Sequence, residues 1–281
     1  MILIADSGST KTQWFLTDSV NKPIELITLG FNPVMLSTAE IVSGLEKTMI
    51  PQLGKKNKMV RQIFFYGAGC SSADMQEKIK NILLPFFPNC AEISVLSDLW
   101  AGIHAGCGKE AGISCILGTG SNACVYDGEK IIGQLPSLGY FLGDEGSGNH
   151  IGKELVKAYF YGDMLGDLRK KFKEKFGLEE HNFVKALYSQ SRPNRYLASF
   201  ALFGADNRES QFIQKIVKNC FELFADVQIR KLQTAEYLPL YFVGSIAKGF
   251  ENELTAVMES RNYKVADIQK SPFPKLLEYY K

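Results

Sequence analysis

A short pattern occurs twice along the chain, and it constrains the fold more than any other feature of the sequence. An apolar run at residues 2–5 is followed by a tight stretch rich in Gly, Ser and Thr at residues 6–10, and then by an alternating run at residues 12–17. The same succession recurs about 112 residues later, at residues 112–126. Short apolar runs bounded by turn residues predict buried strands. The repetition therefore predicts two similar α/β halves.

Further elements are expected in both halves. The capping-box spacing of Ser37 and Glu40 predicts the start of a helix that runs to about Leu53. Most of residues 147–232 carries apolar residues at three- and four-residue spacing, which is typical of helices. Further strands are expected at residues 24–29, 63–66, 93–96, 130–135, 240–243 and 264–267, and further helices at residues 73–84 and 247–259.

Two domains follow from this pattern. Residues 1–108 are expected to form one domain, and residues 109–281 the other, which contains the helical stretch as an insertion. The last helix is expected to pack back on the first domain. No low-complexity linker separates the halves, so we expect them to flank a cleft directly.

Composition excludes several classes of protein. The chain has 281 residues, 46% of them hydrophobic, which is enough for a sizeable core. It carries 32 basic and 30 acidic residues without a long run of one sign, so we expect no nucleic-acid partner. No apolar run approaches the roughly 20 residues of a membrane span, and the N-terminus lacks a basic leader. The six cysteines form no CxxC pair, as suits a reducing compartment, so we expect a cytoplasmic protein without a membrane partner.

The first Gly/Ser/Thr turn has the composition of a phosphate site. Gly8 lets the backbone approach an anion without a Cβ in the way, and successive N–H groups of such a turn form a nest for phosphate oxygens. Asp6, at the end of the preceding strand, is placed to hold Mg²⁺ through water. The other residues expected to bind phosphate are Ser9, Thr10, Lys11 and Thr12. An ordinary hairpin turn would explain the same residues, and the Walker A pattern is absent.

The second turn also has the composition of a phosphate site. It comprises Gly118, Thr119 and Gly120, followed by Ser121 and Asn122. Two glycines flank a threonine after a buried strand. Each turn alone is a weak signal. Two such turns at equivalent places in two halves could clamp a triphosphate from both sides.

Asp98 follows the strand expected at residues 93–96. In open α/β sheets the carboxyl ends of the strands face the ligand. A carboxylate there can accept the proton of an attacking hydroxyl, as phosphoryl transfer requires. The alternative is that Asp98 only caps the helix that begins with Leu99 and Trp100.

Two carboxylates and an amide mark a candidate sugar site. Asp144 and Glu145 lie on a Gly-flanked turn before a helix, where carboxylates suit hydrogen bonds to sugar hydroxyls. A capped helix start is the alternative, and it explains one acid more easily than two. Asn32, directly before Pro33, either points from a rigid turn toward a ligand or merely turns the chain.

These motifs, in this order, resemble those of the actin/hexokinase/heat-shock-protein-70 ATPase superfamily. More narrowly, the chain resembles the N-acetylglucosamine kinase branch, grouped with the BadF/BadG-type ATPases, over nearly its whole length. GTGSN at residues 118–122, followed 21 residues later by GDEGS, is the most specific match in both wording and spacing. The resemblance implies an α/β fold of two ribonuclease-H-like (actin-like ATPase) domains that flank an interdomain cleft.

The resemblance also implies roles for single residues. Residues 6–12 and 118–122 match the two phosphate motifs, and residues 240–247, which include Gly244 and Ser245, match the adenosine motif. Asp98 matches the catalytic aspartate. The residues that match sugar contacts are Asn32, Asn122 and Asp144.

The sequence departs from the family pattern in several places. Ser7 stands where a glycine is usual, and Tyr140 follows Gly139 where a GGWG-like turn is common, which alters the expected sugar pocket. The segment after Ser271 and Pro272 lacks the small residues that continue the closing helix. The zinc-binding cysteine cluster of the ROK sugar kinases is absent, which argues against that neighbouring family.

The resemblance implies an enzyme of amino-sugar metabolism and cell-wall recycling, a kinase that uses ATP and Mg²⁺. Its expected substrate is N-acetylglucosamine or N-acetylmuramic acid, phosphorylated at O6 with Asp98 as general base, and a homodimer is expected. Two alternatives stay open: an ATPase that activates a radical dehydratase, as in BadF-type relatives, and a non-catalytic sugar-sensing protein that binds ATP. Leu117, rather than a cysteine motif for an iron–sulfur cluster, precedes GTGSN. The sequence does not decide between the amino sugars, because they differ at the N-acetyl or lactyl group and no residue can be assigned to either.

Overall fold

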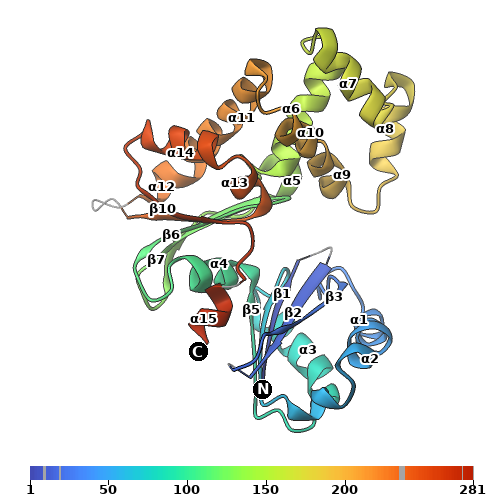
Figure 1. Cartoon of the computed structure of the whole chain (residues 1–281), viewed down its shortest axis with the longest axis vertical. Coiled ribbons are helices and arrows are strands. Elements are labelled where there is room, and N and C mark those ends of the chain that lie inside the picture. The colour runs from blue at the N-terminus through green and yellow to red at the C-terminus, as the bar shows by residue number, and fades with distance from the viewer. Residues whose placement is uncertain (9–10, 19, 234–237, 274, 281) are drawn as a thin grey trace. The chain divides into compact units, whose positions relative to one another are not determined.

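A computed structural model describes residues 1–8, 11–18, 20–233, 238–273 and 275–280. The chain divides into two compact units (Figure 1). Unit 1 comprises Met1–Ala105 together with Pro272–Lys281, and unit 2 comprises Gly106–Ser271. The C-terminal residues therefore belong to the same unit as the N-terminus.

Unit 1 is built on a five-stranded mixed sheet in the order β3-β2-β1-β4-β5. Its strands are β1 (Ile2–Ser7), β2 (Lys11–Thr17), β3 (Ile24–Leu29), β4 (Gln62–Gly67) and β5 (Glu92–Ser97). β2 pairs antiparallel with both β1 and β3, whereas β1, β4 and β5 are parallel. The carboxyl ends of three parallel strands therefore meet at one edge of the sheet.

Unit 2 repeats this topology with a sheet in the order β10-β9-β6-β7-β8. Its strands are β6 (Gly112–Leu117), β7 (Ser121–Tyr126), β8 (Ile131–Gln134), β9 (Leu240–Val243) and β10 (Val265–Gln269). β7 is antiparallel to β6 and β8, and β6, β9 and β10 are parallel. Strands β6 to β10 thus correspond one by one to β1 to β5, which confirms the two similar halves predicted from the sequence repeat.

Helices cover both faces of the first sheet. They are α1 (Thr38–Gly44), α2 (Ile50–Leu53), α3 (Ala73–Leu83), α4 (Asp98–Gly106) and α15 (Lys275–Tyr279), with the short turns η1 (Leu45–Met49), η2 (Gly54–Met59) and η3 (Leu84–Phe86). Successive side chains of a strand point to opposite faces. Leu3 and Ala5 accordingly pack in the cluster that α1 and α3 complete, and Ile4 packs in the cluster of α4 and α15.

The capping box predicted at residues 37–40 is present. The Ser37 hydroxyl accepts the Glu40 N–H at 3.3 Å, and the Glu40 carboxylate accepts the Ser37 N–H at 2.8 Å. The helix continues to Leu53, but it passes through the π-helical turn η1. Unit 2 has a π-helical turn at the equivalent place, η4 (Ala225–Ile229), between α11 (Gln211–Phe224) and α12 (Arg230–Leu232). Such turns are rare and often occur at functional sites.

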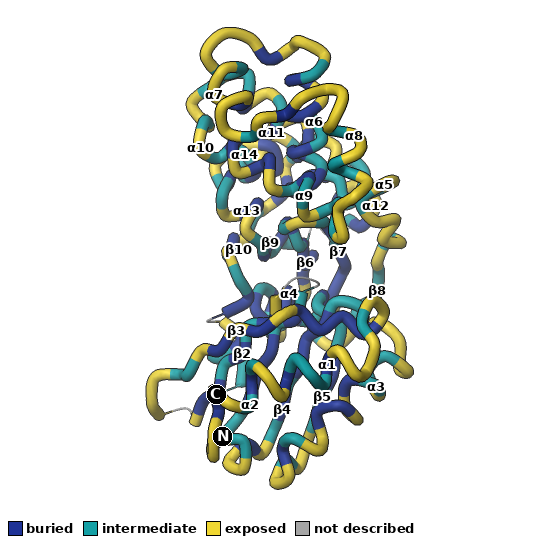
Figure 2. The backbone as a smooth tube through the Cα atoms, turned by 90° about the vertical axis from the view of Figure 1, so that its right-hand side faces the viewer, coloured by how far each residue is buried: buried dark blue, intermediate teal, exposed yellow. Residues whose placement is uncertain are grey.

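The remaining helices belong to unit 2, and its core is rich in phenylalanine. They are α5 (Gly139–Leu142), α6 (Gly148–Phe160), α7 (Gly166–Phe176), α8 (Glu180–Tyr188), α9 (Pro193–Ser199), α10 (Ala201–Asp206), α13 (Ser245–Gly249) and α14 (Glu251–Glu259). Phe172, Phe200 and Phe221 are buried in one cluster, and each such side chain contributes roughly 1.5–3 kcal/mol on burial. Figure 2 shows that the inner strands β1, β4, β6 and β7 are mostly buried, whereas α7 and α8 are mostly exposed. Phe172 is the one buried residue of α7, so this side chain holds the helix to the unit.

The C-terminal segment completes unit 1 through aromatic contacts. The ring of Phe273 lies against Phe15 with centroids 4.1 Å apart, and Tyr280 stacks on Phe64 at 3.8 Å. The Tyr66 hydroxyl forms a hydrogen bond with the Tyr280 hydroxyl. Phe273 and α15 thus cover, together with α4, one face of the first sheet.

Candidate functional site

Two carboxylates, Asp6 and Asp98, lie at the edge of the first sheet where the parallel strands end. Asp6 is next to last in β1, and Asp98 is the first residue of α4, directly after β5. β4 runs between them, and the register aligns Asp6 with Tyr66 and Tyr66 with Leu96. Neighbouring strands are about 4.8 Å apart, so the two backbones are separated by roughly 10 Å. Both carboxylates are therefore within reach of one ligand.

Burial raises the pKa of both carboxyls. The pKa of Asp6 is raised to about 7, chiefly by burial and further by the negative charge of Asp98, while Lys11 opposes the shift. The pKa of Asp98 is raised by burial, although the backbone N–H groups of Leu99 and of Asp98 itself favour its ionised form. Two buried carboxylates at one edge repel each other, and a proton or a cation relieves the repulsion.

Ser7 and Thr12 tie the first hairpin together. Their hydroxyls lie 2.7 Å apart, both residues are fully buried, and the Ser7 hydroxyl also accepts the N–H of Phe31 at 3.1 Å. Thr12 donates to the carbonyl oxygen of Leu29 at 3.1 Å. The Thr12 hydroxyl therefore ties the hairpin together, and its contact with a phosphate stays a prediction. The Ser7 hydroxyl supplies bonds that a glycine at this position could not make.

The other residues of the first turn are placed only in part. Ser9 and Thr10 lie outside the described residues. Lys11 is exposed, and its carbonyl oxygen accepts the Gly8 N–H at 3.0 Å. Among the described residues, only this carbonyl oxygen would lie within 4 Å of a Cβ on Gly8, at 3.7 Å. That Gly8 leaves room for a phosphate stays a prediction.

Asn32 lies in the loop after β3, where it is 9% exposed. Its side-chain oxygen accepts the Val34 N–H at 3.0 Å, and its carbonyl oxygen accepts the N–H groups of Met35 and Leu36. A Cβ on Gly69 would come within 2.3 Å of the Asn32 amide oxygen, so this glycine makes room for the amide. Asn32 therefore turns the chain, and its contact with a sugar stays a prediction.

The second turn is bonded to the start of α6. The carbonyl oxygen of Gly118 accepts the Gly148 N–H at 2.8 Å, and that of Thr119 accepts the Asn149 N–H at 3.1 Å. The Asn149 amide donates to Thr119 as well, and to the Asp144 carboxylate at 2.8 Å. Asn149 is fully buried, and the motif analysis missed it. The sequence signal that could have identified Asn149 is a polar residue in the first turn of a helix, on the face that packs against the protein interior.

Asp144 is held against the second turn in a strained conformation. Its φ of 62° lies in the left-handed region, which is uncommon outside glycine and costs on the order of 1–3 kcal/mol. One carboxylate oxygen accepts the Ser121 N–H at 3.2 Å. A Cβ on Gly120 would lie 2.8 Å from the other oxygen, so any side chain at this position would displace the carboxylate. Burial raises the pKa of Asp144, although the bonds from Ser121 and Asn149 favour its ionised form.

The predicted sugar residues of unit 2 line one pocket. Asn122, Asp144 and Glu145 border a cavity of about 170 Å³. The side-chain oxygen of Asn122 accepts the Gln134 amide at 3.3 Å, which orients it. The cavity is smaller than the roughly 300–1,000 Å³ of a complete small-molecule site. It therefore suits one side of a sugar rather than a whole nucleotide.

Gly244, from the predicted adenosine motif, packs on the second turn. Its φ is 141°, and a Cβ there would lie 2.1 Å from the carbonyl oxygen of Leu117 and 3.1 Å from the N of Gly118. The Gly244 N–H donates to the Gln269 carbonyl oxygen at 2.8 Å, and Ser245 begins α13. The end of β9 and the predicted phosphate turn therefore adjoin, as one nucleotide site requires.

Curated proteins include a partial match to the chain, although no protein-family model matches it. An N-acetylmuramic acid/N-acetylglucosamine kinase from Clostridium acetobutylicum is 28% identical over 156 residues, which are 54% of this chain and 51% of that protein. The matched segment thus spans about half the length of the curated relative.

Solved structures match along the full length. A Porphyromonas gingivalis protein, provisionally named an N-acetylglucosamine kinase, is 34% identical with a TM-score of 0.93, over 100% of this chain and 98% of the other. The chain belongs to the N-acetylglucosamine kinase family of actin-like ATPases. A second protein of that provisional name, from Chromobacterium violaceum, covers 100% of this chain and 98% of its own at 19% identity and a TM-score of 0.73, which shows the fold alone. The family and the fold class inferred from the motifs are thereby confirmed.

The site residues fit the nucleotide and the metal that the N-acetylglucosamine kinase family implies. Mg²⁺ prefers oxygen ligands and keeps several waters, with one or two carboxylates and phosphates completing its shell. Asp6 and Asp98 offer such carboxylates. Among the described residues no cluster of three metal-ligating side chains occurs. Within the same described ranges, none of the helices has the length and apolarity that crossing a membrane requires.

Proposed function

We propose that this member of the N-acetylglucosamine kinase family is an ATP-dependent sugar kinase that phosphorylates O6 of N-acetylglucosamine or N-acetylmuramic acid. The observation that carries the proposal is the contact between the second turn and Asp144. Gly120 of the predicted phosphate turn lies against the carboxylate predicted to bind the sugar, and the Asn149 amide donates to that carboxylate and to the Thr119 carbonyl oxygen of the turn. In this proposal, phosphate and sugar recognition are therefore coupled within unit 2.

Asp98 is the proposed general base. It accepts the proton of the sugar O6 hydroxyl, and O6 bonds to the γ-phosphorus while the bond from that phosphorus to the β–γ bridging oxygen breaks and ADP leaves. The raised pKa of Asp98 makes it a better proton acceptor than an ordinary aspartate, provided that it is ionised. Mg²⁺ at Asp6 would offset the charge of the phosphates.

The other predicted site residues are given the roles that a sugar kinase requires. The first turn, through Gly8, Ser9, Thr10 and Lys11, and the second turn would bind the phosphates. Gly244 and Ser245 would face the adenosine, and Asn32, Asn122 and Glu145 would contact the sugar. ATP is a cytoplasmic substrate and all six cysteines are free, so we place the enzyme in the cytoplasm. A homodimer is proposed on the family resemblance.

The test is ATP consumption by the purified protein with N-acetylglucosamine, N-acetylmuramic acid, glucosamine or glucose, each against a blank without sugar. Strong turnover with an N-acetylated sugar over a low blank supports the proposal. A high blank that no sugar changes would favour an ATPase that activates another enzyme. Binding of ATP without turnover for any sugar would favour a sensor.

An activator with an iron–sulfur cluster has less support. Of the six cysteines only Cys90 is even partly exposed, and the other five are buried. Burial raises the pKa of the Cys70 and Cys124 thiols to about 12, which disfavours the thiolate that a cluster binds. A brown, iron-containing protein after anaerobic purification would overturn this judgement.

A further inference from the structure

The pocket that contains the predicted sugar residues has a second wall. Asn122, Asp144 and Glu145 form one side, and Val227, Gln228 and Lys231 come from the π-helical turn η4 and from α12. We propose that Lys231 binds a carboxylate on the substrate, so that this chain is built for an N-acetylated amino sugar with an acidic ether substituent, as in N-acetylmuramic acid. This inference rests on the proposed function.

The charges of the pocket support this role. Lys231 is the one positively charged residue of the described chain that lines the pocket. Asp144 and Glu145 would repel a negatively charged substituent unless a cation offsets them. The hydroxyls of a neutral sugar need no such cation, because carboxylates and amides already complement them. A lysine on this wall therefore matches an anionic group better than it matches N-acetylglucosamine.

The acids of the pocket do not neutralise Lys231. The oxygens of Asp144 accept bonds from Ser121 and Asn149, and the Glu145 carboxylate accepts the Gln228 amide at 3.5 Å. Among the described residues, none forms an ion pair with Lys231. Its ammonium group, on an exposed residue, is thus available to a ligand.

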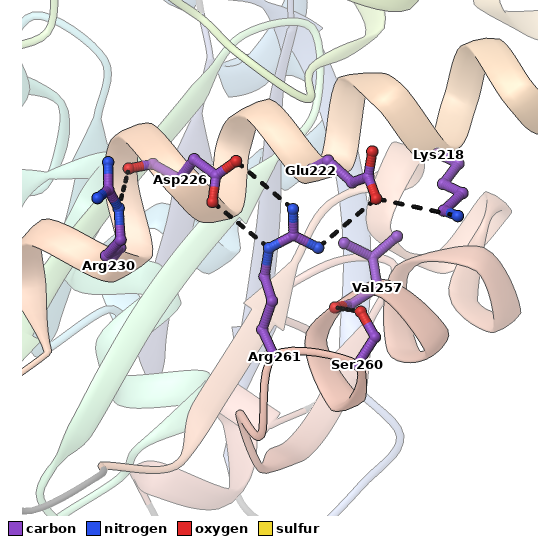
Figure 3. A network of polar contacts seen from close by, with 7 residues as sticks. All are labelled: Lys218, Glu222, Asp226, Arg230, Val257, Ser260 and Arg261. Carbon is purple, nitrogen blue, oxygen red and sulfur yellow. Dashed lines mark hydrogen bonds and ion pairs between the residues drawn. The ribbon is translucent and has the colours of Figure 1, made fainter.

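The turn that carries Lys231 is fixed from its other side. Figure 3 shows Arg261 between Asp226 and Glu222, with Arg261 Nε 3.4 Å from an Asp226 oxygen and Nη1 3.7 Å from a Glu222 oxygen. Arg230 also lies on that side, and its Nε donates to the Asp226 carbonyl oxygen at 3.3 Å. η4 is therefore held in place while Gln228 and Lys231 line the pocket, which limits the freedom lost when a ligand binds.

Apolar residues complete the wall beside Lys231. Val227, Leu135, Pro136 and Leu138 line the same pocket. Acetyl and lactyl groups both carry a methyl group, and apolar side chains favour its burial. The chemistry on this wall, a cation next to apolar side chains, thus matches a lactyl ether, which has a carboxylate and a methyl group on one carbon.

The experiment compares kcat/KM for N-acetylmuramic acid and N-acetylglucosamine in the wild type, Lys231→Met, Lys231→Arg and Lys264→Met. Lys264→Met removes an exposed cation of unit 2 that does not line the pocket, and it serves as the matched control. Lys231→Met is expected to lower kcat/KM for N-acetylmuramic acid by about 10- to 100-fold, the loss of one charge-assisted bond. Its value for N-acetylglucosamine should change less than about threefold, and Lys231→Arg should restore most of the activity on the acidic sugar.

Three outcomes would overturn the inference while the kinase assignment stands. They are an equal loss for both sugars, a wild type that phosphorylates N-acetylglucosamine and rejects N-acetylmuramic acid, and a rise in KM for ATP alone. Calorimetric binding of N-acetylmuramic acid without ATP separates this inference from the proposed function. Binding that Lys231→Met abolishes supports the carboxylate site even if no sugar is phosphorylated, and absence of binding together with absence of turnover overturns both.

Discussion

Replacing Asp6 by Asn is expected to stabilise the protein at neutral pH and to change how its stability depends on pH. Burial and the nearby charge of Asp98 raise the pKa of Asp6 from 3.8 to about 7. In the unfolded chain this carboxyl ionises near its usual pKa, whereas in the folded protein it keeps its proton until about pH 7. Between these values the folded state binds more protons, so the free energy of unfolding falls as the pH rises through this window.

The size of the effect follows from the shift in pKa. A shift of about three units corresponds to about 4 kcal/mol, since each unit is worth about 1.36 kcal/mol. This figure is an upper bound, because Asp6 keeps some contact with solvent and the site can relax when both acids are ionised. About 2–4 kcal/mol of stability is therefore lost by the wild type between roughly pH 4 and pH 8 through this group. The Asp6→Asn variant should not lose this stability, because it has no carboxyl at position 6 to ionise.

Urea unfolding followed by circular dichroism, in buffer with EDTA, measures this loss of stability as a function of pH. The free energy of unfolding of Asp6→Asn minus that of the wild type should rise with pH over the window. Groups remote from Asp6 cancel in this difference, and Asp98, which no longer meets a second charge in Asp6→Asn, adds to the rise. Asp167→Asn, at an exposed surface acid, is the control and should give a flat difference. Added Mg²⁺ should stabilise the wild type and leave Asp6→Asn nearly unchanged. A flat difference for Asp6→Asn would refute the reasoning, because it would mean that the carboxyl titrates alike in both states.

Three further substitutions test single steps of the account. Asp98→Asn should lower kcat about 100-fold or more without lowering the melting temperature, and near-normal turnover would remove Asp98 from the role of base. Gly244→Ala should destabilise the protein by about 2–4 kcal/mol in urea, because its Cβ would lie 2.1 Å from a carbonyl oxygen. Gly118→Ala, with nothing within 4 Å of its Cβ, is the control for stability and should stay within about 1 kcal/mol. Gly120→Ala should displace Asp144 and raise the KM for the sugar at least about tenfold, measured with ATP saturating; an unchanged KM would separate Asp144 from sugar binding.

The strands could be predicted because their signals are local. Apolar runs next to Gly-rich turns located β1 and β6, and the repeat of that pattern foretold the common topology of both sheets. The short helix α5 was missed because it has only four residues and no side-chain cap. Tertiary packing decides such an element, and its own sequence carries little signal.

The candidate site was predictable only where a motif marks it. Asn122, Asp144 and Glu145 follow from two motifs, and the structure brings them to one pocket. Gln228 and Lys231 reach the same pocket from a helix about 80 residues further along the chain, and no spacing rule links them to the motifs. The hairpin bonds of the Thr12 hydroxyl could not be predicted, because a hairpin and a phosphate turn use the same residue types, and its contact with a phosphate stays a prediction.

The most direct test of the central claim is to identify the product. Wild-type protein, ATP, Mg²⁺ and N-acetylglucosamine or N-acetylmuramic acid are incubated, and the product is examined by ³¹P–¹H correlated NMR. A phosphomonoester signal coupled to the two H6 protons of the sugar, absent with Asp98→Asn, is the predicted result. A phosphate coupled to the anomeric proton would contradict the O6 assignment, and release of inorganic phosphate without any sugar phosphate would contradict the kinase.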